Sequence, residues 1–271
     1  MPTIPLDRAH PSTQRARISA VLRTSGATVT VQSTSKALGI EPAAAAKLLS
    51  RWSGQGWIRR IRRGLYAPVP LAAGEGDPVI EDPWTLVPEL FAPAYVGGMT
   101  AAHHWDLTEQ IFRTVYVLTE RPVRRKNLTI QGTPFVLRHL PGDMIFGTKD
   151  IWRGAAKVPV SDVHRTVIDM LDDPSCGGGI RHVADCLRAY LRRKDAEPDR
   201  LVSYADRLGN GAVFKRLGFL AEPIAPGSPL LEACRQRLTE GTVKLDPAVP
   251  SPRLVRKWRL RLPNAWKAGR A

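Results

Sequence analysis

Apolar residues near the N-terminus recur at helical spacing and then change to strand spacing. They predict an amphipathic helix over residues 14–25, a short helix over 32–38 that ends at Gly39, and a third helix over 42–54 that begins with proline. Residues 57–69 then predict two short strands around a basic turn. Helix, helix, tight turn, helix and hairpin is the order of a winged helix-turn-helix.

The hydrophobic pattern is interrupted over residues 69–82, where proline, glycine and acidic residues predict an interdomain linker. Beyond it, short apolar runs and amphipathic stretches alternate. The predicted strands are 95–97, 113–119, 128–130, 135–139 and 157–160. The predicted helices are 83–91, 99–105, 163–171, 180–193, 201–208, 213–220 and 229–238. The strands are too short and too unevenly spaced for regular βαβ units. We therefore predict an α+β protein, with a winged helix-turn-helix over 1–68 and a larger mixed α/β domain over 83–271.

The third helix has two distinct faces, as a DNA-reading helix requires. Its predicted apolar side, which would pack on the first two helices, is Ala45, Leu48, Leu49 and Trp52. The opposite side carries Ala44, Lys47 and Arg51. Small residues there permit close approach to base edges and thymine methyls, and the cations can reach guanine acceptors or phosphates. The hairpin carries arginines suited to phosphates or a narrow minor groove, namely Arg59, Arg60, Arg62 and Arg63. The alternatives for this head are a solvated basic face or a protein-binding winged helix.

The distribution of charge supports a polyanionic partner. Residues 1–68 carry eleven Lys/Arg against two acids, and residues 253–271 carry seven bases and no acid. Between them, 22 bases balance 23 acids, so the formal net charge of +15 is concentrated at the two ends. Together with the helix-turn-helix pattern, this predicts binding to double-stranded DNA. Charge alone would also suit RNA or a membrane surface.

The composition argues against several other classes of protein. No run of about 18 apolar residues occurs, and the N-terminus lacks the apolar stretch of a secretory signal, so we expect a cytoplasmic protein without a membrane partner. The three cysteines are too few and too scattered for a disulfide framework or a zinc cluster. We therefore predict no metal and no cofactor.

Two basic clusters in the otherwise neutral region are candidates for a second nucleic-acid surface. They are Arg124, Arg125 and Lys126, and Arg192, Arg193 and Lys194. Such clusters are usually solvated loops or helix faces. The basic C-terminal tail, over 253–262, alternates imperfectly and fits a closing edge strand as well as a nucleic-acid arm.

An enzymatic interpretation begins from Asp162, His164 and Asp169, which suggest a metal-dependent nuclease. Asp162, however, precedes an apolar-periodic stretch where a helix N-cap belongs, and His164 and Asp169 lack the i, i+4 spacing of a ligand pair. The adjacent histidines at 103 and 104 would point about 100° apart on a helix. Residues 176–179, Cys-Gly-Gly-Gly, lack the Lys-Ser/Thr of a nucleotide loop and predict a turn. We therefore predict that the protein is not an enzyme.

Several segments in order resemble the AbiEi-type antitoxins, which are the regulators of type IV toxin–antitoxin systems. The segments are GWIRRIRRGLYAPVP, AYVGGMTAAHHWDLTEQIFRTVYVLTERP, VPVSDVHRTVIDMLDDPSCGGG, VFKRLGFLAE, VKLDPAVP and KWRLRLPNAW. The resemblance extends from about residue 14 to 264.

This resemblance implies a protein with two functions. The winged head would bind inverted repeats in its own promoter and repress its operon. The C-terminal domain would counteract a cognate nucleotidyltransferase toxin without a stable complex. The alternative is a plain transcription regulator whose C-terminal domain senses a small ligand.

Overall fold

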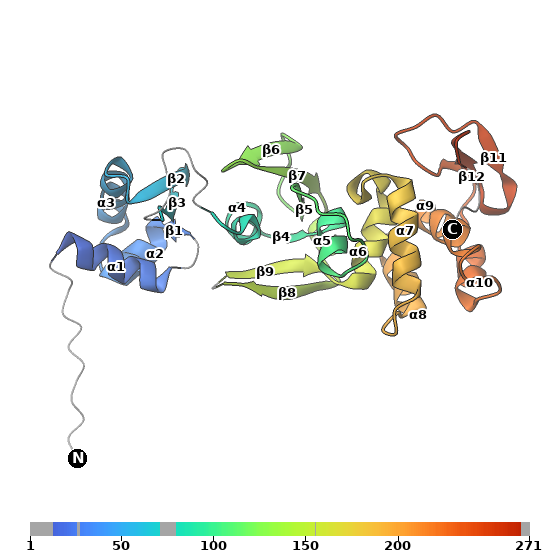
Figure 1. Ribbon diagram of the computed structural model, residues 1–271, viewed down its shortest axis with the longest axis horizontal. Helices are drawn as coiled ribbons and strands as arrows, with labels where there is room; N and C mark the ends of the chain where they lie inside the picture. The colour runs from blue at the N-terminus through green and yellow to red at the C-terminus, as the bar shows by residue number, and fades with distance from the viewer. Residues whose placement is uncertain (1–12, 26–27, 71–79, 155, 267–271) are drawn as a thin grey trace, which may run out of the picture. The chain divides into compact units, whose positions relative to one another are not determined.

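The computed structural model describes residues 13–25, 28–70, 80–154 and 156–266. The chain divides into two compact units. The first comprises Met1–Leu86, Thr129–Gly132 and Trp152–Lys157, and the second comprises Val87–Leu128, Thr133–Ile151 and Val158–Ala271. We call residues 13–70 the head. We call residues 87–266 the C-terminal domain, a definition by sequence that includes the segments Thr129–Gly132 and Trp152–Lys157. Figure 1 shows the elements of each. Most of the predicted linker, residues 71–79, lies outside the described residues.

The head contains three helices and a small sheet. The elements are α1 (Gln14–Thr24), β1 (Val29–Thr30), α2 (Val31–Leu38), α3 (Pro42–Gly54), β2 (Ile58–Arg62) and β3 (Leu65–Pro68). Local sequence sets these boundaries. The Thr30 hydroxyl accepts a hydrogen bond from the Ser33 N–H, and the Ser33 hydroxyl accepts one from the Thr30 N–H, so the two residues form a capping box for α2. Gly39 ends that helix at φ 63°, in the left-handed region that favours glycine.

The sheet of the head has the strand order β1-β3-β2, with antiparallel pairing throughout. Its apolar side and the three helices enclose one core, formed by Val21, Val29, Leu38, Leu49, Trp52, Ile58 and Tyr66. The observed order of helices and strands is that of a winged helix-turn-helix, with β2 and β3 as the wing.

The C-terminal domain contains a mixed six-stranded sheet of order β6-β7-β5-β4-β9-β8. The strands are β4 (Ala94–Val96), β5 (Val115–Thr119), β6 (Asn127–Ile130), β7 (Thr133–His139), β8 (Thr148–Arg153) and β9 (Ala156–Ser161). Strand β5 is parallel to β7 and antiparallel to β4, and β4 is parallel to β9. All five residues of β5 are buried, as expected for a strand inside a sheet.

Most helices of the domain lie to one side of this sheet (Figure 1). They are α4 (Leu86–Phe91), α5 (Gly98–His104), α6 (Val163–Asp172), α7 (Ile180–Leu191), α8 (Pro198–Leu208), α9 (Gly211–Ala221) and α10 (Pro229–Gln236). Helix α6 is buried at every position from Val163 to Leu171. It contacts α5, α7, α8 and α9, so it forms the centre of the domain. Among the described residues, no helix is long and apolar enough to cross a membrane.

A second, small sheet closes the chain, with the order β10-β12-β11. Its strands are β10 (Val243–Lys244), β11 (Arg253–Val255) and β12 (Leu260–Leu262). The tail therefore forms strands, as one of the two interpretations expected. The last strand, β12, lies at the centre of the small sheet and not at its edge. Trp258 lies between β11 and β12, is fully buried, and donates a hydrogen bond from Nε1 to Glu222 at 2.9 Å. This contact joins the small sheet to the end of α9.

The predicted α+β class, with a helix-turn-helix head and a larger mixed domain, is confirmed. Each predicted strand and helix has a counterpart, with boundaries shifted by a few residues. Strand β8 was not predicted. Its sequence, TKDIWR, lies at the sheet edge and exposes most of its side chains, so it lacks the apolar alternation by which strands are recognised.

Candidate nucleic-acid interface

Helix α3 is held in the head by one row of side chains. Ala45, Leu49 and Trp52, at i, i+4 and i+7, are each fully buried. Leu48, predicted to belong to the same apolar side, is half-buried at its margin. This row fixes the rotation of the helix about its own axis, so it decides which residues face outward.

The outward face is centred on Ala43, Lys47 and Ser50. Each lies two residues before a member of the buried row, and a shift of two residues rotates a helical position by about 200°. All three are exposed. Ala46 is exposed on one flank of this face. The outward face therefore carries small apolar side chains in the first turns of the helix and a positively charged side chain at its middle.

Of the three residues predicted on α3, one lies at the centre of the outward face and two lie on its flank. Ala44 and Arg51, one position before buried residues, are exposed on the other flank, while Lys47 is central. The sequence prediction did not include Ala43, Ala46 or Ser50. Their exposure can be worked out from the buried row, because the positions of the buried residues fix which side of the helix faces outward. A prediction based on positively charged residues does not include alanine or serine.

The wing presents the predicted arginines at the β2–β3 turn. Arg60, Arg62 and Arg63 are exposed, and Arg59 is half-buried. The pairing of β2 with β3 shifts register between Arg60 and Arg62, a bulge that re-aims side chains at this point. Gly64 closes the turn at φ 80°. The wing is thus a short basic loop with a fixed backbone.

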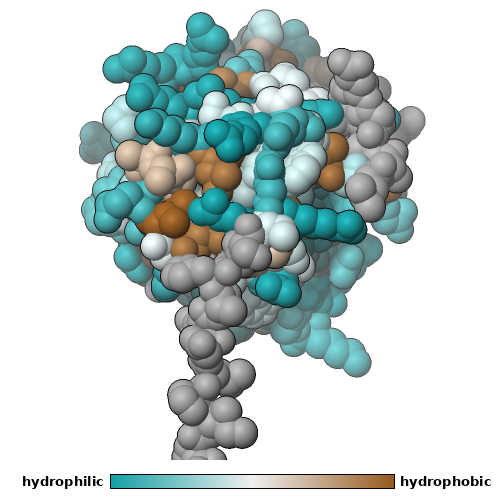
Figure 2. Space-filling model, turned by 90° about the vertical axis from the view of Figure 1, so that its left-hand side faces the viewer, coloured by the Kyte–Doolittle hydropathy of each residue, from teal (hydrophilic) through white to brown (hydrophobic). Residues whose placement is uncertain are grey.

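Little negative charge opposes these cations. Among the described residues of the head, Glu41 is the only acid. Within the described part of the chain, no ion pair joins Lys47, Arg51 or Arg60 to a carboxylate. Figure 2 shows hydrophilic side chains over most of the face it displays, with smaller hydrophobic areas among them. Exposed cations such as Lys47 and Arg51 beside small apolar groups are suited to a nucleic-acid duplex.

The two basic clusters of the C-terminal domain differ in how firmly they are held. Arg124, Arg125 and Lys126 are exposed before β6. In the second cluster, Arg193 donates hydrogen bonds to Asp195 at 2.8 and 3.0 Å and to the Trp105 carbonyl at 2.7 Å. Arg193 therefore ties the end of α7 to the end of α5, while its neighbours Arg192 and Lys194 are exposed.

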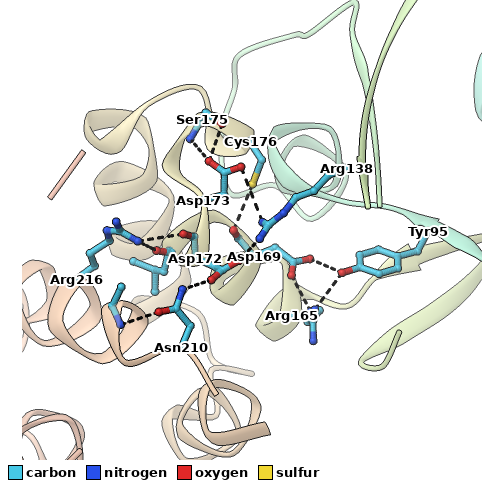
Figure 3. A network of polar contacts seen from close by, with 12 residues as sticks. Tyr95, Arg138, Arg165, Asp169, Asp172, Asp173, Ser175, Cys176, Asn210 and Arg216 are labelled. Atoms are coloured by element: carbon cyan, nitrogen blue, oxygen red, sulfur yellow. Dashed lines mark hydrogen bonds and ion pairs between the residues drawn. The ribbon is translucent and has the colours of Figure 1, made fainter. Parts of the chain in front are cut away.

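The acids that suggest a nuclease are bound to other side chains. Asp162 caps α6, accepting from the Arg165 N–H at 2.7 Å, and also accepts from the Tyr204 hydroxyl at 2.8 Å. Asp169 accepts from Arg165 Nε at 2.8 Å and from the Tyr95 hydroxyl at 3.0 Å, all inside the core (Figure 3). Burial raises the pKa of the Asp169 carboxyl, against the opposing effect of the Arg165 guanidinium.

The rest of this buried network secures the end of α6. Arg216 donates to the carbonyls of Leu171 at 2.8 Å and Asp172 at 3.0 Å, satisfying groups that the helix leaves unpaired (Figure 3). The Asp172 carboxylate pairs with Arg138 and accepts from Asn210 at 2.6 Å. These contacts join α6 to β7 and α9, which is a structural role.

Two of the three candidate histidines are packed against other side chains. His164 is buried and hydrogen-bonds the Tyr190 hydroxyl at 2.8 Å. His104 packs edge-on against Trp105, with ring centroids 4.6 Å apart, while His103 is exposed. Across the described residues, no group of three His, Cys, Asp or Glu side chains is placed to hold a metal ion.

The turn from Cys176 to Gly179 is tightly packed. A Cβ at Gly177 would lie 2.4 Å from Val183 Cγ2, so the glycine permits close contact with α7. The Ile180 N–H, at the start of α7, donates to the Asp246 carboxylate at 3.2 Å. That carboxylate lies where a phosphate would bind a helix N-terminus, so the geometry favours a structural turn.

Comparison with known proteins identifies a family model that matches the head and a solved structure that shares the fold of the chain. Residues 16–69 match the family model described as "Transcriptional regulator, AbiEi antitoxin". This match confirms, over the head, the resemblance that the sequence indicates. Among solved structures, the chain is similar to the RV2827C protein from Mycobacterium tuberculosis, with 15% identity and a TM-score of 0.63 over 92% of this chain and 91% of that one. That likeness shows a shared fold. No curated protein sequence matches the chain.

Proposed function

We propose that this protein is a DNA-binding transcriptional repressor that uses α3 as its recognition helix and the β2–β3 hairpin as its wing. The observation that carries the proposal is the exposed face of α3, with Ala43, Lys47 and Arg51 turned away from the core. The match of residues 16–69 to a regulator family supports it.

The two elements have different tasks in this proposal. Lys47 and Arg51 contact guanine edges or nearby phosphates in the major groove. The wing arginines contact phosphates, which positions the head without reading sequence. The proposed target is the promoter of the protein's own operon, bound at inverted repeats.

We extend the proposal to an antitoxin role for the C-terminal domain. The family description supports it, and the proposed partner is a nucleotidyltransferase toxin counteracted without a stable complex. The proposal includes no catalytic role for this chain. The acids that would serve a nuclease, Asp162 and Asp169, are engaged in helix capping and in a buried ion pair.

The test is a binding titration of the full chain on the duplex DNA upstream of its own gene. Scrambled DNA of the same composition is the control, and each duplex is titrated with salt. We expect tighter binding to the upstream duplex and a steep fall in affinity as salt rises, because bound phosphates release counterions.

A variant carrying both Lys47→Ala and Arg51→Ala tests the assignment to α3. It should lose the preference for the upstream duplex while its melting temperature stays close to wild type, because both side chains are exposed. Equal binding of wild-type protein to both duplexes would reject sequence-specific regulation. Full preference in the double variant would reject α3 as the reader.

A further inference from the structure

We infer that the hairpin formed by β8 and β9 binds single-stranded nucleic acid, with one unpaired base stacked on the Trp152 ring and a phosphate beside the Lys157 ammonium. The inference does not depend on the proposed function, because it involves neither α3 nor the wing. It assigns a ligand to one edge of the six-stranded sheet.

The Trp152 side chain is open to solvent. It lies in β8, an edge strand of the sheet, and is 66% exposed. Its neighbours along the strand do not extend it into an apolar patch, because Thr148, Lys149 and Asp150 are polar and exposed. The centre of a protein–protein interface is apolar and is built from several clustered side chains. A single aromatic ring among polar side chains is better suited to a planar ligand that stacks on it.

Each cation of this hairpin lies over a tryptophan ring. The three pairs, with the distance from the cation to the ring centroid, are Lys149 with Trp105 at 5.5 Å, Arg153 with Trp84 at 4.2 Å, and Lys157 with Trp152 at 5.9 Å. Trp84 and Trp105 are half-buried, so their cations help to cover them. Trp152 differs, because it remains exposed although Lys157 lies over it. This pair therefore places a positive charge beside a ring that a ligand can still reach.

The charge of the hairpin suits a phosphodiester backbone. Residues 148–161 contain three bases and one acid, Asp150. Lys157 is exposed, so its ammonium can contact a phosphate next to a base that stacks on Trp152. A positively charged surface with exposed aromatic rings is the combination by which proteins bind single strands.

The ring also decides between a single strand and a duplex. In a duplex, the faces of each base are covered by the neighbouring base pairs, whereas the bases of a single strand can leave the stack and pack on an aromatic side chain. An exposed tryptophan therefore favours unpaired nucleotides. This ligand differs from the duplex that the head is proposed to bind.

The experiment measures binding of the full chain to fluorescently labelled single strands of about 12 nucleotides, a length within the range that one binding module covers. The probes are oligothymidylate and oligouridylate, and an abasic strand with the same number of phosphates is the control. We expect the better of the two probes to bind about 5- to 150-fold more tightly than the abasic strand, which corresponds to about 1–3 kcal/mol for one stacked base. Preference for oligouridylate would identify RNA as the source of the bases, and preference for oligothymidylate would identify DNA; either supports the inference.

Substitutions in the hairpin assign the binding to its side chains. Trp152→Ala should bind the base-bearing and abasic strands alike, whereas Trp152→Phe retains an aromatic ring and should retain part of the difference. Lys157→Ala should reduce the slope of log affinity against log salt by about 0.7, the value for one phosphate contact on a single strand. The substituted side chains are exposed, so the melting temperatures should stay close to wild type.

The chain offers a matched control for each change. Ile111→Ala removes another exposed apolar side chain, and Lys244→Ala removes another exposed cation. Ile111→Ala should keep the wild-type difference between base-bearing and abasic strands. Lys244→Ala should keep the wild-type salt slope.

The outcomes separate this inference from the proposed function. Equal affinity of the wild-type chain for base-bearing and abasic strands would overturn base stacking. A difference that persists in Trp152→Ala would overturn the assignment to the hairpin, and its loss in the variant with Lys47→Ala and Arg51→Ala would place the strand on the head. Absence of a preference for the upstream duplex would reject sequence-specific regulation and leave the inference about the hairpin intact.

Discussion

At the scale of single residues, the polar side chains of the C-terminal domain act in pairs that stabilise the fold. Asp162 caps a helix, Asp169 pairs with Arg165, and His164 is buried against Tyr190. A charged group buried in this way is favourable only with a partner, since breaking such a pair leaves an uncompensated charge. The residues that look catalytic in the sequence are those that such a core requires.

His164 gives a prediction about pH at this scale. Burial lowers the pKa of its imidazole from the ordinary value of 6.5, and the positive charge of Arg200 lowers it further. The negative charges of Asp162, Glu197 and Asp195 act in the opposite direction, but burial is the largest effect. Between the lowered folded pKa and 6.5, the unfolded chain binds more protons than the folded one. The free energy of unfolding should therefore fall as pH drops below about 6.5.

The measurement is urea unfolding at pH 7.5 and 5.5 for wild type and His164→Gln. The variant should show a smaller loss of stability between the two pH values. His103→Gln removes an exposed histidine and should keep the wild-type loss. An equal pH dependence in wild type and His164→Gln would contradict the prediction.

At the scale of elements, the proposed function divides DNA recognition between a helix and a hairpin. Lys47 lies at the centre of the outward face of α3, and Arg62 lies beside the bulge in the wing. A base contact and a phosphate contact respond differently to sequence and salt, so the two elements are separable by experiment.

We expect Lys47→Ala to weaken binding to the preferred duplex by about 1–3 kcal/mol and to relax sequence preference. Arg62→Ala should weaken binding to all duplexes alike and reduce the slope of log affinity against log salt by about one. Salt titrations of both variants on preferred and scrambled duplexes make the comparison. Identical behaviour of the two variants would argue against this division of roles.

The attachment of the small sheet to α9 is a second property at this scale. An added Cβ at Gly218 would lie 2.0 Å from Trp258 Cζ3, so the helix and the ring require glycine there. Gly218→Ala should therefore lower the free energy of unfolding by about 1–3 kcal/mol through overpacking.

Gly54→Ala is the matched control for that change. Gly54 ends α3, and nothing lies within 4 Å of the Cβ that alanine would add. We expect it to be neutral or to stabilise by about 0.4–1 kcal/mol, because alanine restricts the unfolded chain more than glycine does. Chemical denaturation of both variants would test the pair, and a neutral Gly218→Ala would show that α9 and Trp258 can separate at little cost.

At the scale of the whole molecule, basic charge is concentrated in the head and the tail, while the region between is neutral. In the proposed function, operator binding belongs to the head and the antitoxin role to the C-terminal domain. The two activities should therefore respond to different substitutions.

The double variant Lys47→Ala with Arg51→Ala should lose repression of a reporter driven by the upstream DNA. It should still protect cells that express the neighbouring nucleotidyltransferase gene, because the C-terminal domain is unchanged. Reporter output and growth of the same strains measure both. Loss of protection together with repression, at equal protein level, would show that the head is needed for both activities.

The sequence by itself determined the order of elements and the chemistry of the head. Helix spacing, the glycine after α2, the proline at the start of α3 and the arginine-rich hairpin are local features, and local interactions decide such boundaries. Strand β8 was missed because an exposed edge strand needs no apolar alternation. The exposed residues Ala43, Ala46 and Ser50 were not among the predicted residues, because that prediction was centred on the cations of α3.

Tertiary structure decided what the remaining polar residues do. Asp169 meets Tyr95, 74 positions away in the chain, and Asp246 meets the start of α7 from 66 positions away. No spacing rule predicts such contacts, because they depend on how strands and helices pack. The sequence therefore determined that the head is suited to bind DNA, whereas packing decided that the acids of the C-terminal domain support its core.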